Sequence, residues 1–119
     1  MAKNQVFPYT RSLSAVATAP ATPASGDPVM VGQLPGVALV AKDTVTNETV
    51  IALDGVFNLS VKGENNAGNT AVAVGDILYY EAGQTPPVNK DNVAGIRFGY
   101  ALAAINSGVT ATIAVAVGY

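Results

Sequence analysis

Residues 51–61, with the sequence IALDGVFNLSV, place the dipeptide Asp54-Gly55 between two runs of apolar and β-prone residues. Asp-Gly is typical of a two-residue type I′ turn, because both central residues of that turn require a positive φ. We therefore expect a β-hairpin with one strand on either side of this dipeptide. Apolar residues alternate with other types in the second strand, so the face that carries Phe57 and Leu59 is predicted to point into the core.

The chain on both sides of this stretch, from residue 28 onward, also favours strands. Gly and Pro at 32–36, Gly75-Asp76 and residues 106–108 mark turns between short apolar runs. The segment 82–92 contains Pro86-Pro87 and is too irregular to be predicted as a central strand. We predict an all-β fold, a compact small β-sandwich or β-barrel-like domain with little or no helix. The expected strands span residues 29–31, 36–41, 47–53, 56–62, 77–81, 97–105 and 109–117.

The N-terminal part of the chain has a different composition. Residues 14–28 consist largely of Ala, Thr, Pro, Ser and Gly, which favours an extended chain over a helix. An aromatic segment, NQVFPYTRS at 4–12, precedes it. We expect an extended N-terminal arm with an Ala/Pro/Thr-rich linker over residues 1–24, and a β domain over 25–119. An ordinary first strand followed by a long loop fits the same pattern.

Composition excludes several classes of function. The chain has 119 residues, which favours one domain, and its six basic and eight acidic residues give a net charge of −2. Without a basic patch we expect neither nucleic-acid nor membrane binding. No apolar run reaches the roughly 18 residues of a membrane span, and the start of the chain lacks the apolar core of a secretory signal. We therefore expect the protein to be made and kept, or assembled, in a cytoplasm.

The sequence offers few residues for catalysis. Histidine and cysteine are absent, which excludes Ser-His-Asp and Cys-His machinery and the commonest metal ligands. The eight carboxylates are scattered, and Asp54, Asp76 and Asp91 lie in turn contexts that favour local hydrogen bonding. Ser60 and Lys62 share one strand face, but such a pair is common by chance. We expect no enzymatic activity, no cofactor and no metal site.

Three motifs in order suggest a family. They are Gly55-Val56-Phe57-Asn58-Leu59, Gly75-Asp76-Ile77-Leu78-Tyr79 and Gly99-Tyr100-Ala101-Leu102-Ala103-Ala104. With the segments around them, over residues 25–117, the chain resembles the tailed-phage capsid cement, or head decoration, family of small β proteins. One departure is the long ATAPATPAS segment at 17–25, where the family pattern passes quickly from its first strand to the next segment.

The resemblance implies a structural role in the virion. Proteins of this family bind the outer surface of the expanded capsid, stabilise it against internal DNA pressure, are often trimeric and need no cofactor. The expected partners are the major capsid protein and further copies of this chain, as a homotrimer on the outer capsid surface after synthesis in the host cytoplasm. The expected capsid-docking arm consists of Gln5, Val6, Phe7, Pro8, Tyr9, Thr10 and Arg11. The expected subunit interface includes Tyr100, Leu102, Ala114 and Ala116.

Two other functions remain open from the residues. A carbohydrate- or ligand-binding β module would use Tyr79 or Tyr80 and the loop 82–92, although Trp, the usual sugar platform, is missing. An enzyme with paired carboxylates would need two acidic side chains within about 5–10 Å in a cleft, and we rank it last.

Overall fold

The computed structural model describes residues 12–118, and these residues form strands, turns and loops without a helix. The predicted all-β fold is therefore confirmed. No helix in this part of the chain is long and apolar enough to cross a membrane. The strands are β1 (Ser12–Ala15), β2 (Pro28–Val31), β3 (Leu34–Ala38), β4 (Thr49–Ala52), β5 (Gly55–Lys62), β6 (Glu64–Asn65), β7 (Gly68–Asn69), β8 (Ile77–Tyr80), β9 (Val88–Asn89), β10 (Ile96–Ala101) and β11 (Thr110–Val117).

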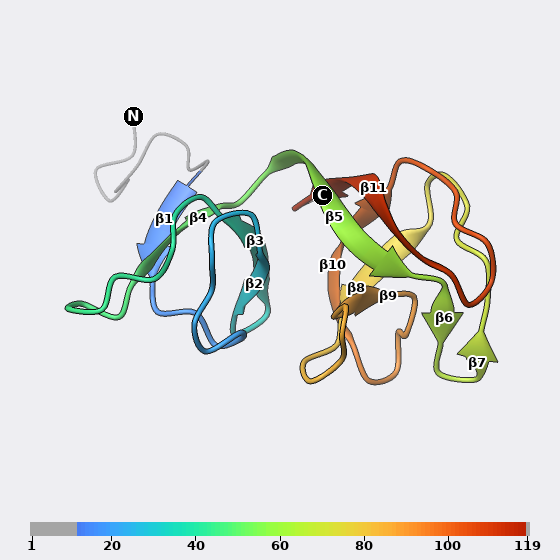
Figure 1. The fold of residues 1–119 in the computed structure, drawn as a ribbon, viewed down its shortest axis with the longest axis horizontal. Coiled ribbons are helices and arrows are strands. Elements are labelled where there is room, and N and C mark those ends of the chain that lie inside the picture. The colour runs from blue at the N-terminus through green and yellow to red at the C-terminus, as the bar shows by residue number, and fades with distance from the viewer. Residues whose placement is uncertain (1–11, 119) are drawn as a thin grey trace, which may run out of the picture.

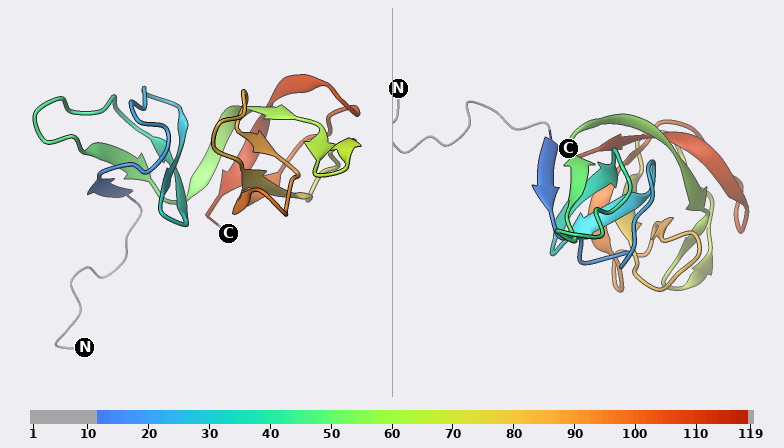
Figure 2. Two further views of the ribbon diagram at one scale, coloured as in Figure 1. Left: turned by 90° about the horizontal axis from the view of Figure 1, so that it is seen from below. Right: turned by 60° about the vertical axis from the view of Figure 1, so that its left-hand side comes forward.

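The strands form two parts that lie side by side (Figures 1 and 2). The first, which we call the N-terminal sheet, has the antiparallel order β1-β4-β3-β2. The second, the barrel, closes in the order β10-β11-β5-β9-β8 through pairing of β8 with β10. β5 and β9 pair in parallel and the other neighbours in the barrel are antiparallel. The short hairpin β6-β7 stands beside the barrel (Figure 1).

The hairpin predicted around Asp54-Gly55 is wrong. β4 pairs with β1 and β3, whereas β5 pairs with β11 along its whole length, from Gly55 opposite Val117 to Lys62 opposite Thr110. Gly55 has a φ of 115°, but Asp54 is not among the residues with positive φ, so a type I′ turn does not form. The dipeptide instead carries the chain from the N-terminal sheet to the barrel (Figure 1). Eight paired residues on β11 and burial of the inward face outweigh a local turn preference.

The main core lies inside the barrel and confirms the inward face predicted for the strand at 56–62. Leu59 and Val61 of β5 and Val115 of β11 are buried, and the partly buried Phe57 packs against the same cluster. Met30 and Val37 of the N-terminal sheet join the same cluster, and β3 contacts β10 and β11. The full cluster comprises Met30, Val37, Leu59, Val61, Val72, Leu78, Tyr80, Val88, Phe98, Ala101, Ile105, Ile113, Val115 and Val117. The N-terminal sheet is therefore packed onto the barrel through its β2-β3 hairpin.

Turn chemistry in two places matches the prediction. Gly32, with a φ of 61°, follows β2 in the β2-β3 hairpin. Gly75, with a φ of 90°, and Asp76 lead into β8, and the Ala73 N–H donates to Asp76 Oδ2 at 2.8 Å. These contacts are local in sequence, which is why residue types alone indicate them.

Two strand predictions need correction. Segment 82–92 does contain a barrel strand, because Val88 of β9 pairs with both Val61 and Tyr80 and closes the barrel. Pro86-Pro87 only precede this two-residue strand, so they remove no hydrogen bond from it. The strand expected at 97–105 ends at Ala101, and the Ile105 backbone forms a separate bridge with Val72.

The N-terminal region enters the structure at β1. Leu13 pairs with Ile51 of β4, and the Ala19 backbone forms a bridge with Met30. Part of the segment predicted as arm and linker thus belongs to the N-terminal sheet. The predicted docking arm, residues 5–11, lies outside the described residues, and the domain boundary at residue 24 stays a prediction.

Candidate functional site

The four residues predicted at a subunit interface lie on one outward wall of the barrel. Tyr100 of β10 stands opposite Ala116 of β11, and Ala116 stands opposite Val56 of β5. In the next row, the Leu102 N–H donates to the Ala114 carbonyl oxygen at 2.9 Å. Val56 and Leu102 are 59% and 43% exposed. We call the set Val56, Tyr100, Leu102, Ala114 and Ala116 the outward wall.

Arg97 supports Tyr100 on this wall and was not identified from the sequence. Its guanidinium donates a hydrogen bond to the Tyr100 hydroxyl oxygen and lies 5.4 Å from the centre of the ring. A Cβ at Gly99 would lie 2.1 Å from the Ala116 carbonyl oxygen, so only glycine lets β10 approach β11 this closely. The register shift of β10 against β8 lies between Arg97 and Gly99. Such a bulge has no clear signal in this sequence, because the pairing partner defines it.

The second surface is the free edge of β1. Among the described residues β1 pairs with β4 on one side and with no strand on the other. Ser12 and Ser14 are exposed, and Val16, just beyond the strand, is 57% exposed. The strand contains neither Pro nor Lys, the residue types that commonly protect a free edge. Its backbone N–H and C=O groups on that side can therefore accept a further strand.

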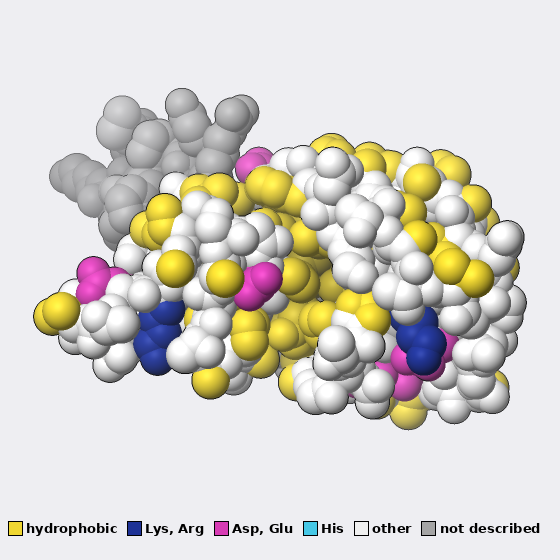
Figure 3. All heavy atoms as spheres, in the orientation of Figure 1, with side chains coloured by type: hydrophobic (Ala, Val, Ile, Leu, Met, Phe, Trp, Pro, Cys, Tyr) yellow, Lys and Arg dark blue, Asp and Glu magenta, His cyan; other side chains and the backbone are white. Residues whose placement is uncertain are grey.

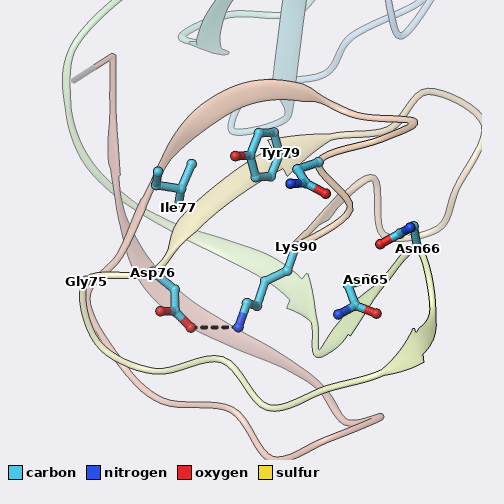
Figure 4. Close-up of a pocket in the computed structure, with 8 residues that line it drawn as sticks. Asn65, Asn66, Gly75, Asp76, Ile77, Tyr79 and Lys90 are labelled. Atoms are coloured by element: carbon cyan, nitrogen blue, oxygen red, sulfur yellow. Dashed lines mark ion pairs between the residues drawn. The ribbon is translucent and has the colours of Figure 1, made fainter.

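The third surface is a concavity of about 440 Å³ at the side of the barrel (Figure 4). Lys90 crosses it and places Nζ 2.9 Å from Asp76 Oδ2 and 3.0 Å from the Ala71 carbonyl oxygen. The hydrogen bond from the Ala73 N–H and the contact with Lys90 lower the pKa of the Asp76 carboxyl, so it is ionised. The two charges neutralise each other.

The structure separates the two tyrosines considered for ligand binding. Tyr80 is 5% exposed and packs on Phe98 with ring centroids 6.2 Å apart. Burial and the nearby charge of Asp27 raise the pKa of its hydroxyl. Tyr79 is half-buried and lines the concavity together with Lys90 of the loop 82–92. Asn65 of β6 also lines it, and the sequence does not predict that residue at a ligand site. The alternation of side chains along β8 makes this division necessary.

A fourth surface lies between the N-terminal sheet and the barrel, where hydrophobic side chains gather (Figure 3). Two hollows of about 290 and 200 Å³ share Ala19 and Tyr80 in their walls. Pro20 and Pro28 line the first, while Met30 and Ile96 contribute to the second. This apolar groove marks the line along which the two parts meet.

Asp76 and Asp91, two of the carboxylates predicted to lie in turns, accept hydrogen bonds from nearby backbone N–H groups. Asp91 Oδ1 accepts hydrogen bonds from the Val93 and Ala94 N–H groups, each at 2.9 Å, and these bonds lower its pKa. The turn interpretation of Asp76 and Asp91 is therefore confirmed. Residues 12–118 contain no group of three or more His, Cys, Asp or Glu side chains that could hold a metal ion. The described residues therefore offer four surfaces for contacts with other molecules: the outward wall, the free edge of β1, the concavity beside the barrel and the apolar groove.

Comparison with known proteins adds one finding. A family model described as "Phage cement protein" matches residues 8–117, which include the whole N-terminal sheet and the whole barrel. No curated protein and no solved structure matches the chain.

Proposed function

The chain belongs to the phage cement protein family, and from that premise we propose that it binds the outer surface of the expanded phage capsid and stabilises it against internal DNA pressure. The family match over residues 8–117 is the observation that carries this proposal, because it spans almost the whole chain. A cement protein is a structural component, and we propose no enzymatic activity for this chain.

The docking element that we propose is the arm, residues 5–11. It carries Val6, Phe7 and Tyr9 as apolar side chains for pockets on the capsid and Arg11 as a charge at the rim. The arm leads directly into β1. An extended segment of this kind can add a strand to a partner's sheet, where backbone hydrogen bonds supply affinity and alternate side chains supply specificity.

The self-contact that we propose is a homotrimer built on the outward wall. Its five side chains are largely apolar, and Ala114 and Ala116 are small enough to let another copy approach closely. The exposed Asn58 stands opposite Ala114 on the same face. Exposure of Val56 and Leu102 on the same wall supports this assignment, since exposed apolar side chains that share one face commonly mark an interface. Many modest contacts across a closed lattice then add up to a large stabilisation of the shell.

Co-sedimentation with expanded phage heads that lack this protein tests the proposal, with unexpanded proheads as the control. Saturable binding to expanded heads alone is the expected result and gives the copy number per shell. Absence of binding to both particles would contradict the proposal. Deletion of residues 1–11, which leaves β1 intact, should abolish head binding while the melting temperature of the β body is kept. A full-length chain with Val6, Phe7 and Tyr9 replaced by Ser should lose binding in the same way.

Replacement of Ala114 by Glu tests the self-contact. A carboxylate in the centre of an apolar interface would be buried without a partner, so the oligomer should dissociate to monomers. Light scattering measures the mass, and Ala67→Glu in the exposed β6-β7 turn is the matched control. An oligomeric mass that is the same in both variants would rule out the outward wall as the interface.

A further inference from the structure

We propose that the concavity beside the barrel, lined by Asn65, Asn66, Asp76, Tyr79, Lys90 and Asn92, binds a neutral carbohydrate. This function goes beyond capsid cementing and uses neither the arm nor the free edge of β1. We call this site the Asn–Tyr pocket. Its ligand class follows from three properties: the asparagine side chains in its lining, the tyrosine ring on its apolar side and the balance of its charges.

The lining of the pocket carries three asparagine side chains. Asn66 and Asn92 are exposed, and Asn65 is half-buried and accepts the Ala67 N–H on its Oδ1 at 2.9 Å. This bond leaves the NH₂ group of Asn65 as a donor. An amide side chain offers both a donor and an acceptor, and sugar hydroxyl groups need both. The set is suited to a ligand rich in hydroxyl groups.

The apolar side is formed by Tyr79 and Ile77, which occupy alternate outward positions on β8. Figure 4 shows both along one side of the pocket, with Asn65 and Asn66 on the other side and Lys90 between. A Cβ at Gly95 would lie 2.7 Å from the Tyr79 Cβ, so the tyrosine is packed against the Gly95 backbone. A tyrosine ring can pack against the C–H face of a sugar while its hydroxyl stays in contact with water.

The charges in the pocket favour a neutral ligand. Lys90 is the only lysine or arginine in the lining and Asp76 the only carboxylate, and the two form an ion pair at 2.9 Å. A phosphate would have to compete with Asp76 for Lys90, and a divalent cation would find a single carboxylate. The volume of about 440 Å³ lies within the roughly 300–1,000 Å³ of small-molecule sites. A mono- or disaccharide unit is therefore the class that fits.

The backbone fixes the two sides of the pocket relative to each other. The Lys90 N–H donates to the Glu64 carbonyl oxygen at 2.9 Å, which ties the lysine to β6, next to Asn65. Its Nζ bonds the Ala71 carbonyl oxygen and Asp76, which ties it to the segment before β8. The ligand would therefore meet a preformed site, which lowers the entropic cost of binding. Repetition of a weak site over a capsid would raise its effective affinity.

An NMR titration of the full-length ¹⁵N-labelled protein tests the site. The probes are maltotriose, cellobiose, mannotriose and chitotriose, each up to about 20 mM, since an open site of this size is expected to bind with a roughly millimolar Kd. At least one sugar should shift the side-chain amide signals of Asn65, Asn66 and Asn92 in a saturable way. No shift with any of the four sugars would overturn the proposal.

Variants and a charged probe make the test specific. Asn66→Ala removes an exposed side chain and should weaken binding of the active sugar roughly tenfold. Asn106→Ala, an exposed asparagine outside the pocket, is the matched control and should leave the Kd unchanged. Equal Kd values for both variants would contradict the assigned site. A glucose 6-phosphate that binds more tightly than every neutral sugar would contradict the assigned ligand class.

Discussion

The barrel and the N-terminal sheet differ in how they are stabilised. The main core cluster contains fourteen buried residues, and only Met30 and Val37 of these come from the N-terminal sheet. The separate cluster within the sheet contains three buried residues, Val29, Ala38 and Ile51. The barrel therefore has a core of its own, whereas the sheet depends on the barrel for much of its burial.

The two parts also differ in their strand edges. Closure of β8 onto β10 leaves the barrel without an open edge, but β1 leaves one on the N-terminal sheet. A closed barrel is a rigid body that does not recruit further strands, whereas an open edge can. The proposed functions follow this division, with capsid docking next to the sheet and the trimer contact and sugar site on the barrel.

The largest expected effect is on the barrel core. Phe98→Ala removes a fully buried ring from the main cluster and should lower the free energy of unfolding by about 4 kcal/mol. Ile51→Ala in the small cluster should cost only about 2 kcal/mol, because fewer neighbours surround the cavity. Urea denaturation followed by circular dichroism measures both. A larger loss for Ile51→Ala would reverse the ranking of the two parts.

A smaller effect is expected where the two parts meet. Met30→Ala removes the larger of the two side chains that the N-terminal sheet contributes to the main cluster and should lower the free energy of unfolding by roughly 2–3 kcal/mol. Hydrogen exchange should then show lower protection in β2, β3 and β4 and unchanged protection in β5 and β11. Val31→Ala, half-buried against the small cluster, is the control. Equal loss of protection in both parts would show that they unfold as one unit.

The smallest expected effect is on the pH dependence of stability, through Asp76 beside the barrel strand β8. The pKa of Asp76 is lower in the folded protein than its ordinary value of 3.8, so the unfolded chain binds more protons around that pH. Stability that is present above pH 3.8 is therefore lost as the pH falls through the lower, folded-state pKa. Asp76→Asn should reduce this loss of stability at low pH. At pH 7 it should lower the free energy of unfolding by less than about 1 kcal/mol, because the ion pair is partly exposed.

Thermal melts between about pH 2 and pH 7 measure the dependence on Asp76. Asp54→Asn, an exposed aspartate between β4 and β5, is the control. A melting curve for Asp76→Asn that still falls as steeply as that of the unchanged protein below pH 4 would show that the contacts with Lys90 and the Ala73 N–H do not stabilise the fold.

Much of the fold could be predicted because its signals are local. Alternation along β5 identified Leu59 on the inward face, and this side chain is buried. Asp76 and Asp91 were recognised as turn residues from their neighbours, and their carboxylates accept nearby backbone N–H groups. In the Asn–Tyr pocket, the sequence indicates only Tyr79 and the loop 82–92 as candidates for ligand binding. It does not indicate Asn65, because this residue reaches the pocket through a backbone contact between segments that are distant in sequence.

The sequence by itself determined the all-β class, the inward face of β5 and the family, since these depend on residue type and on a period of two. Tertiary structure alone decided which strands pair. Asp54-Gly55 favours a local turn, yet β5 pairs with β11 and not with β4. This pairing joins eight residues of β5 to eight of β11 and buries Leu59 and Val61 in the barrel. The residue pattern along one strand indicates which of its faces is apolar, but which strand pairs with it depends on the fold of the whole chain.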